Sequence, residues 1–162
     1  MPPQPPSSPL GAFLAALREA QIQCVLIGAM AAVRQGAPIT TIDYDFWVRL
    51  PERQYVRIFA IVRQQGGVIL RRTFYELSDG TQVNAVFQPD GLESFEKEYK
   101  QCPVATLAGQ RVRVLPLSRV IASKRASGRD KDLAVLPILE RTLRLSRRLK
   151  SHRQPRRDKQ LD

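Results

Sequence analysis

The chain has 162 residues, enough for a single domain with a buried core. Its hydrophobic fraction of 43% suits a globular protein, and no apolar run reaches the roughly 18 residues that a membrane span needs. The N-terminal MPPQPPSSPL lacks the basic and apolar regions of a signal peptide, and Cys24 and Cys102 form neither a metal motif nor a disulfide framework. We therefore expect a cytoplasmic protein with reduced thiols and no membrane partner.

The formal net charge of +11 is unevenly distributed along the chain. From Arg141 onward, nine basic residues stand against two acidic ones. Two interpretations stay open: a solubilising tail, or a segment that contacts the phosphate backbone of RNA. We predict a disordered proline-rich segment over 1–8, one domain over 9–149 and a disordered basic tail over 150–162.

The first half of the chain alternates helices and strands. Ser8 is placed to cap a helix over 9–20, and the apolar run 24–27 predicts a short buried strand that ends at Gly28. A short helix over 29–35 is closed by Gly36. The stretch TIDYDFWV predicts a strand over 41–48, and a helix over 51–65 follows before two glycines.

The second half predicts strands over 68–77 and 81–88 around an SDG turn, then a helix over 92–101. A single β segment is expected over 106–116. Ser118 is expected to cap a helix that stops at Gly128, and a last helix over 130–149 contains Pro137. This mixed order predicts an α+β (or α/β) fold in which a small mixed sheet is flanked by helices.

The stretch TIDYDFWV places two aspartates inside a run of bulky apolar residues. Side chains alternate along a strand, so Asp43, Asp45 and Trp47 share one face and the apolar residues between them share the other. Two carboxylates about 7 Å apart repel each other unless a cation or water reaches both. Mg²⁺ (or Mn²⁺) binds such carboxylates together with phosphate oxygens. The alternative is a solvent-facing edge strand with incidental aspartates.

The upstream residues strengthen the metal interpretation. A strand ends at Gly28 and Ala29, where a helix begins, and Gly36, Thr40 and the aspartate pair follow. This arrangement resembles the nucleotidyltransferase superfamily that includes DNA polymerase beta. The likeness is greatest to small bacterial AbiEii-type toxin nucleotidyltransferases and related domains. Both GAMAAVRQGAPITTIDYDFWV and the downstream KRASGRDKDLAVLPIL are similar to their motifs, and the resemblance covers about 11–139.

The resemblance implies the superfamily's fold and a Mg²⁺-dependent transfer from a nucleoside triphosphate to a hydroxyl acceptor. It implies catalytic roles for Asp43, Asp45 and Lys124. It implies nucleotide binding by Gly28, Ala29, Thr41, Lys124, Arg129 and Asp132. It implies metal binding by Asp43, Asp45 and Asn84. Asp132 either orients a lysine, Lys124 or Lys131, or caps the last helix.

The chain departs from the superfamily pattern at Asn84. Active members carry a third carboxylate at this place, and a neutral amide can ligate a cation but cannot act as a base. Three hypotheses therefore stay open. The first is an active transferase with an RNA acceptor, in a toxin–antitoxin-like system. The second is a catalytically weakened module of the same fold that binds nucleotide, RNA or a cognate partner protein. The third is a nucleic-acid-binding protein with structural carboxylates.

Overall fold

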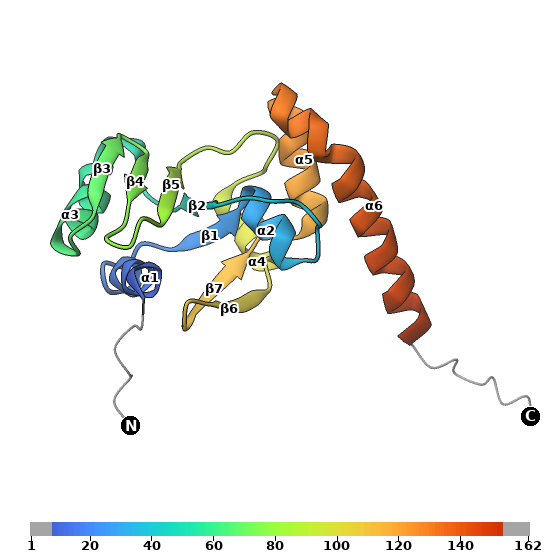
Figure 1. The fold of residues 1–162 in the computed structure, drawn as a ribbon, viewed down its shortest axis with the longest axis horizontal. Coiled ribbons are helices and arrows are strands. Elements are labelled where there is room, and N and C mark those ends of the chain that lie inside the picture. The colour runs from blue at the N-terminus through green and yellow to red at the C-terminus, as the bar shows by residue number, and fades with distance from the viewer. Residues whose placement is uncertain (1–7, 154–162) are drawn as a thin grey trace, which may run out of the picture.

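A computed structural model describes residues 8–153 of the chain (Figure 1). The described residues form six α-helices, one 3₁₀ helix and seven strands. In chain order these are α1 (Pro9–Glu19), β1 (Cys24–Ile27), α2 (Gly28–Arg34), β2 (Asp43–Val48), η1 (Glu52–Gln54), α3 (Val56–Gln64), β3 (Val68–Arg71), β4 (Phe74–Glu76), β5 (Gln82–Val86), α4 (Phe95–Gln101), β6 (Val104–Leu107), β7 (Gln110–Val114), α5 (Leu117–Ser127) and α6 (Asp130–Arg153).

All seven strands belong to one open mixed sheet with the order β3-β4-β5-β2-β1-β7-β6. The central strand β2 is antiparallel to β1 and parallel to β5, and β1 is parallel to β7. In this register Asp45 lies opposite Ile27 on one side and opposite Asn84 on the other. The middle of the sheet therefore brings the end of β1, the aspartates of β2 and Asn84 together.

Helices cover both faces of the sheet. Phe13 of α1 packs against Phe46, with 6.3 Å between ring centroids, and Phe95 of α4 packs edge-on against Trp47 at 5.1 Å. Because neighbouring residues of a strand point to opposite faces, α1 and α4 lie on opposite sides of β2. On the Trp47 side α2 packs against α5, and α5 packs against α6 (Figure 1).

The predicted α+β fold with a mixed sheet and flanking helices is confirmed. Two predicted strands were wrong, because 68–77 and 106–116 each fold into a pair of antiparallel strands, β3–β4 and β6–β7. The strand predicted from residue 41 begins at Asp43. Ile42 is 73% exposed, so the apolar face of β2 is buried only at Phe46 and Val48.

The helix ends follow the sequence signals in part. Ser8 caps α1 and Gly128 ends α5 in the left-handed conformation, as expected. Ser118 does not cap α5, because that helix already begins at Leu117, after Pro116. The last helix runs to Arg153, so residues 150–153 of the predicted disordered tail are helical. The predicted disorder over 1–7 and 154–162 lies outside the described residues.

No helix within residues 8–153 combines the length and the apolar character that a bilayer crossing requires.

Candidate active site

The site is built around the junction of β1 and α2. Gly28 follows the buried end of β1 and has φ +68°, a left-handed conformation that other residues rarely adopt. A Cβ atom at this position would lie 2.4 Å from Oδ2 of Asp45. The carboxylate of Asp45 can therefore lie against the start of α2 only because residue 28 has no side chain.

Asn84 holds the other oxygen of this carboxylate. Its Nδ2 donates a hydrogen bond to Asp45 Oδ1 at 2.9 Å, from the position directly opposite on the parallel strand β5. Burial raises the pKa of Asp45 above the ordinary value of 3.8. The Asn84 hydrogen bond and the charges of Lys124 and Lys131 oppose this increase, whereas the neighbouring Asp43 adds to it.

Asp43 has a buried oxygen without a partner. Its Oδ1 is shielded from solvent and accepts no hydrogen bond from any residue in 8–153. A buried carboxylate oxygen with no donor is costly unless a ligand satisfies it. Together with the adjacent Asp45, this orphaned oxygen fits a divalent cation.

The possible metal ligands are few. Within the described part of the chain, no group of three or more His, Cys, Asp or Glu residues gathers in a geometry that could hold a metal. The donors here are two carboxylates and one amide, and the amide turns its NH₂ group toward Asp45. The two carboxylates would leave most coordination positions of a bound cation open to water or to phosphate oxygens. This arrangement suits Mg²⁺.

A second polar cluster forms where α5 meets α6. Asp132 is 2% exposed and accepts hydrogen bonds from Lys124 Nζ at 3.0 Å, Ser127 Oγ at 2.7 Å and Arg129 Nε at 2.7 Å. Burial alone would raise the pKa of Asp132, but these donors outweigh it and lower the pKa to about 2. Asp132 is therefore a charged anchor that holds Lys124 in place. Of the roles predicted for Asp132, its contacts fit the orientation of Lys124, and they include no contact with Lys131.

All the residues predicted for the site line one cleft of about 940 Å³. They are Gly28, Ala29, Thr41, Asp43, Asp45, Asn84, Lys124, Arg129 and Asp132. The cleft thus joins two sequence motifs that are about 80 residues apart. The structure shows that these residues lie together, whereas their roles in binding and catalysis stay predictions.

The cleft also contains residues that the sequence did not point to. Arg71 and Thr73 enter from the β3–β4 turn, and Asp90 enters from the loop after β5. The sequence RRT at that turn carries no glycine, proline or asparagine, so nothing marked the hairpin. Ser127 lies next to the helix-ending Gly128, and only its contact with Asp132 reveals its role.

Two further side chains near the site, Trp47 and Arg34, do not line the cleft. Trp47 shares its strand face with the aspartates but is buried against Phe95, and its Nε1 donates to the Phe87 carbonyl at 3.2 Å. Trp47 is therefore a packing residue of the sheet. Arg34 donates to the Thr106 carbonyl of β6 and does not line the cleft.

Known structures share this fold. The antibiotic-resistance factor ANT(2'')-Ia, in a solution structure, has a TM-score of 0.55 at 18% identity, covering 88% of this chain and 90% of its own. The lincosamide antibiotic adenylyltransferase LnuA, bound to lincomycin, has a TM-score of 0.54 at 8% identity, covering 83% and 96%. An antigenic nucleotidyltransferase-like protein from Paracoccidioides brasiliensis has 0.52 at 16% identity, covering 83% and 74%.

These likenesses confirm that the chain has the nucleotidyltransferase superfamily fold. At such identities they concern the fold alone, and the narrower AbiEii-type resemblance stays a prediction. No protein-family model matches the sequence, and no curated protein matches it.

Proposed function

We propose that the protein is a Mg²⁺-dependent (or Mn²⁺-dependent) nucleotidyltransferase that binds a nucleoside triphosphate in the cleft and transfers its nucleotidyl group to a hydroxyl acceptor. One observation carries the proposal: the orphaned oxygen of Asp43 and the carboxylate of Asp45 share a cleft with Lys124 and Arg129. Acidic ligands for a cation and basic ligands for phosphate are the two requirements of phosphoryl chemistry.

Each side chain has a distinct task in this proposal. Asp43 and Asp45 would hold the cation, which supplies charge neutralisation to the triphosphate when bound. Gly28 leaves room for the Asp45 carboxylate beside the nucleotide. Lys124, held by Asp132, and Arg129 would bind phosphate oxygens from the other wall.

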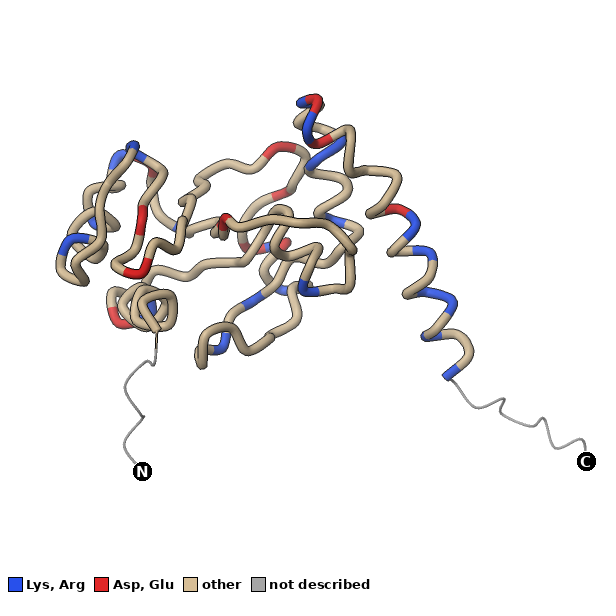
Figure 2. Tube along the Cα trace, in the orientation of Figure 1, with Lys and Arg blue, Asp and Glu red and all other residues tan. Residues whose placement is uncertain are grey.

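We propose RNA as the acceptor because of the positive charge of α6. Basic residues recur along the C-terminal half of α6, which extends past the sheet (Figure 2). Such a helix suits the phosphate backbone of RNA. A structure of ANT(2'')-Ia contains adenylyl-2''-tobramycin, so a small hydroxyl compound is the other acceptor to test. A partner protein and a toxin–antitoxin pair stay predictions, because no surface of residues 8–153 identifies a partner.

Asn84 supports a second candidate, a nucleotide-binding module without turnover. In place of a third carboxylate it offers Asp45 a hydrogen-bond donor, and it cannot remove a proton from an acceptor hydroxyl. The loss of a general base typically costs about 10²–10⁴-fold in rate and leaves ground-state binding of the nucleotide largely intact.

A transfer assay separates the candidates. The purified protein is incubated with Mg²⁺ and each α-³²P-labelled nucleoside triphosphate, with total RNA in one arm and tobramycin in another. Label that appears on either acceptor, and is lost in Asp45→Ala but kept in Gly80→Ala, supports the enzyme. Nucleotide binding that depends on Asp45 without label transfer supports the module. Neither transfer nor Asp45-dependent binding would reject both.

A further inference from the structure

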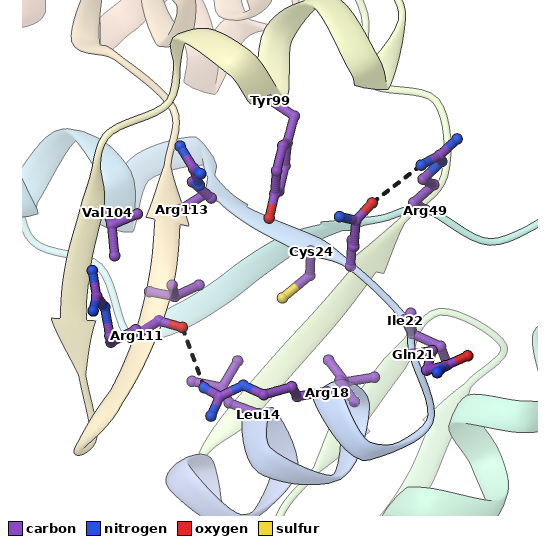
Figure 3. A pocket seen from close by; sticks show the side chains of 13 residues that line it. Leu14, Arg18, Gln21, Ile22, Cys24, Arg49, Tyr99, Val104, Arg111 and Arg113 are labelled. Carbon is purple, nitrogen blue, oxygen red and sulfur yellow. Dashed lines mark hydrogen bonds between the residues drawn. The ribbon is translucent and has the colours of Figure 1, made fainter.

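Figure 3 shows a second hollow. It lies at the opposite end of β1 and β2 from the cleft that contains Asp43 and Asp45, which we call the carboxylate cleft. It has a volume of about 610 Å³ and opens where the chain enters β1, between α1, α4 and the β6–β7 hairpin. It is lined by Cys24, the first residue of β1, whereas the cleft begins at the last residue, Ile27. The two hollows share no lining residue, so a ligand in one leaves the other free.

Arginines surround this hollow, which we call the arginine pocket. Four of its 13 lining residues are arginines and none is aspartate or glutamate. They are Arg18, Arg49, Arg111 and Arg113. The charge of Arg49 is paired with Glu96 at 2.7 Å. The charges of the other three face a hollow without a lining carboxylate, an arrangement that attracts an anion.

Two of the three remaining arginines, Arg113 and Arg18, are positioned by neutral groups. Arg113 lies over the Tyr99 ring at 4.8 Å and donates Nη1 to the Cys102 carbonyl at 2.9 Å. Arg18 reaches the Arg111 carbonyl at 3.5 Å (Figure 3). The Arg111 side chain makes no hydrogen bond or ion pair with residues 8–153. These contacts orient the guanidinium groups of Arg18 and Arg113 without neutralising their charge, so donors of all three arginines remain for a ligand.

The floor of the pocket is apolar. Leu14 and Leu17 of α1, Ile22 and Val112 are all buried beneath it. The ring of half-buried Tyr99 forms a wall and turns its hydroxyl toward Cys24 (Figure 3). Such a hollow fits a small molecule with an apolar or aromatic body, whereas the arginine fork matches a phosphate group.

We propose that the arginine pocket binds a small phosphomonoester with an aromatic or apolar body. The phosphate contacts Arg18, Arg111 and Arg113, and the body rests on the apolar floor beside Tyr99. This site is independent of the proposed transfer reaction, because it lies outside the carboxylate cleft and needs no metal.

Titration of the ¹⁵N-labelled protein with phenyl phosphate, in EDTA, tests the proposal by NMR. EDTA removes divalent cations, so no cation can link Asp43 and Asp45 to a phosphate group in the carboxylate cleft. Amide shifts are expected to cluster in the last turn of α1, at Cys24 and in β7. Inorganic phosphate and phenol, each offering half of the ligand, are expected to bind at least about tenfold more weakly than phenyl phosphate.

Variants assign the binding to the pocket. Arg18→Gln combined with Arg111→Gln is expected to weaken phenyl phosphate binding by at least about tenfold. The matched control, Arg53→Gln with Arg63→Gln, removes the same charge from exposed residues that do not line the pocket and is expected to bind as the parent does. Arg111→Lys, which keeps the charge but not the fork, is expected to bind with intermediate affinity.

Three outcomes would overturn the proposal. They are shifts confined to α6, equal weakening in the pocket and control variants, and equal affinity for inorganic phosphate and phenyl phosphate. The unfolding temperature of each variant shows whether it is folded. If the pocket double variant unfolds, the phenyl phosphate affinity of Arg111→Lys is compared with that of the parent instead, and equal affinities would overturn the proposal.

Discussion

Gly28 and Asp45 are joined by a steric requirement. The Cβ that any other residue would place at position 28 lies 2.4 Å from Asp45 Oδ2, and the backbone there has φ +68°. The two residues are 17 positions apart, yet the antiparallel pairing of β1 with β2 places Asp45 directly opposite Ile27. The sheet register therefore determines both the glycine and the position of the carboxylate.

Gly28→Ala is expected to displace the Asp45 carboxylate and to weaken cation-dependent nucleotide binding by at least about tenfold, with destabilisation of about 1–2 kcal/mol from the positive φ. Gly80→Ala is the matched control. Gly80 has φ +87°, but a Cβ there meets nothing within 4 Å, so only stability should fall. Calorimetric titration and denaturant unfolding measure the two effects. Equal nucleotide binding by both variants would contradict the steric relationship.

Asn84→Asp introduces the third carboxylate that the resemblance to nucleotidyltransferases leads us to expect at this place. The change removes the donor to Asp45 Oδ1 and adds a third negative charge, so the metal-free protein should lose about 1–3 kcal/mol of unfolding free energy. Mg²⁺ should recover this loss, and label transfer should rise by about tenfold or more. Asn84→Ala, which removes the donor without adding a charge, should show no such recovery. A variant destabilised further by Mg²⁺ would argue against a cation at this place.

Asp132→Asn tests the anchor of Lys124. It leaves a lysine that is 14% exposed without its partner, and removal of one member of a buried pair costs about 3 kcal/mol. The folded pKa of Asp132, about 2, lies below its unfolded value, so its stabilisation is present above about pH 4 and is lost as the pH falls toward 2. The difference in unfolding free energy between parent and variant should shrink over that range.

Asp130→Asn, at an exposed position in the same first turn of α6, provides the comparison and should change stability little. Denaturant unfolding measured between pH 5 and about pH 2 would contradict the anchor role if both variants behaved alike.

Asp45 should make cation binding sensitive to acid. A carboxylate must be ionised to hold Mn²⁺, and burial raises the pKa of Asp45. The affinity of the protein for Mn²⁺ should therefore fall on acidification. The fall should start at a higher pH than it would if Asp45 had the ordinary aspartate pKa near 4. Asn84→Ala removes a hydrogen bond that lowers this pKa and should move the fall to still higher pH. Paramagnetic relaxation of water protons measures the bound Mn²⁺, and an affinity that is constant down to about pH 4 would exclude the effect.

Much of the fold could be predicted because its signals are local. Ser8 and Gly128 end helices through backbone chemistry that the residue type reveals, and TIDYDFWV alternates with the period of a strand. The β3–β4 hairpin could not be predicted, because its turn carries no residue with special backbone preferences. The β6–β7 hairpin could have been, since Gly109 supplies a positive φ between the two strands.

The site was predictable in its members but not in their contacts. The spacing of Asp43 and Asp45 places both on one face whatever the rest of the fold. That Asn84 donates to Asp45 depends on the register of two strands 39 residues apart, and that Asp132 binds Lys124 depends on the angle between two helices. Neither relationship has a sequence signal.

The central claim is that Asp43 and Asp45 bind a divalent cation together with a nucleoside triphosphate. Calorimetric titration of the parent and of Asp43→Asn with Mg²⁺ and each nucleoside triphosphate tests it most directly. The parent should bind at least one triphosphate only when Mg²⁺ is present. The variant should lose that binding by about a hundredfold while remaining at least as stable, because the amide relieves the repulsion from Asp45. A variant that binds the triphosphate as tightly as the parent would contradict the account.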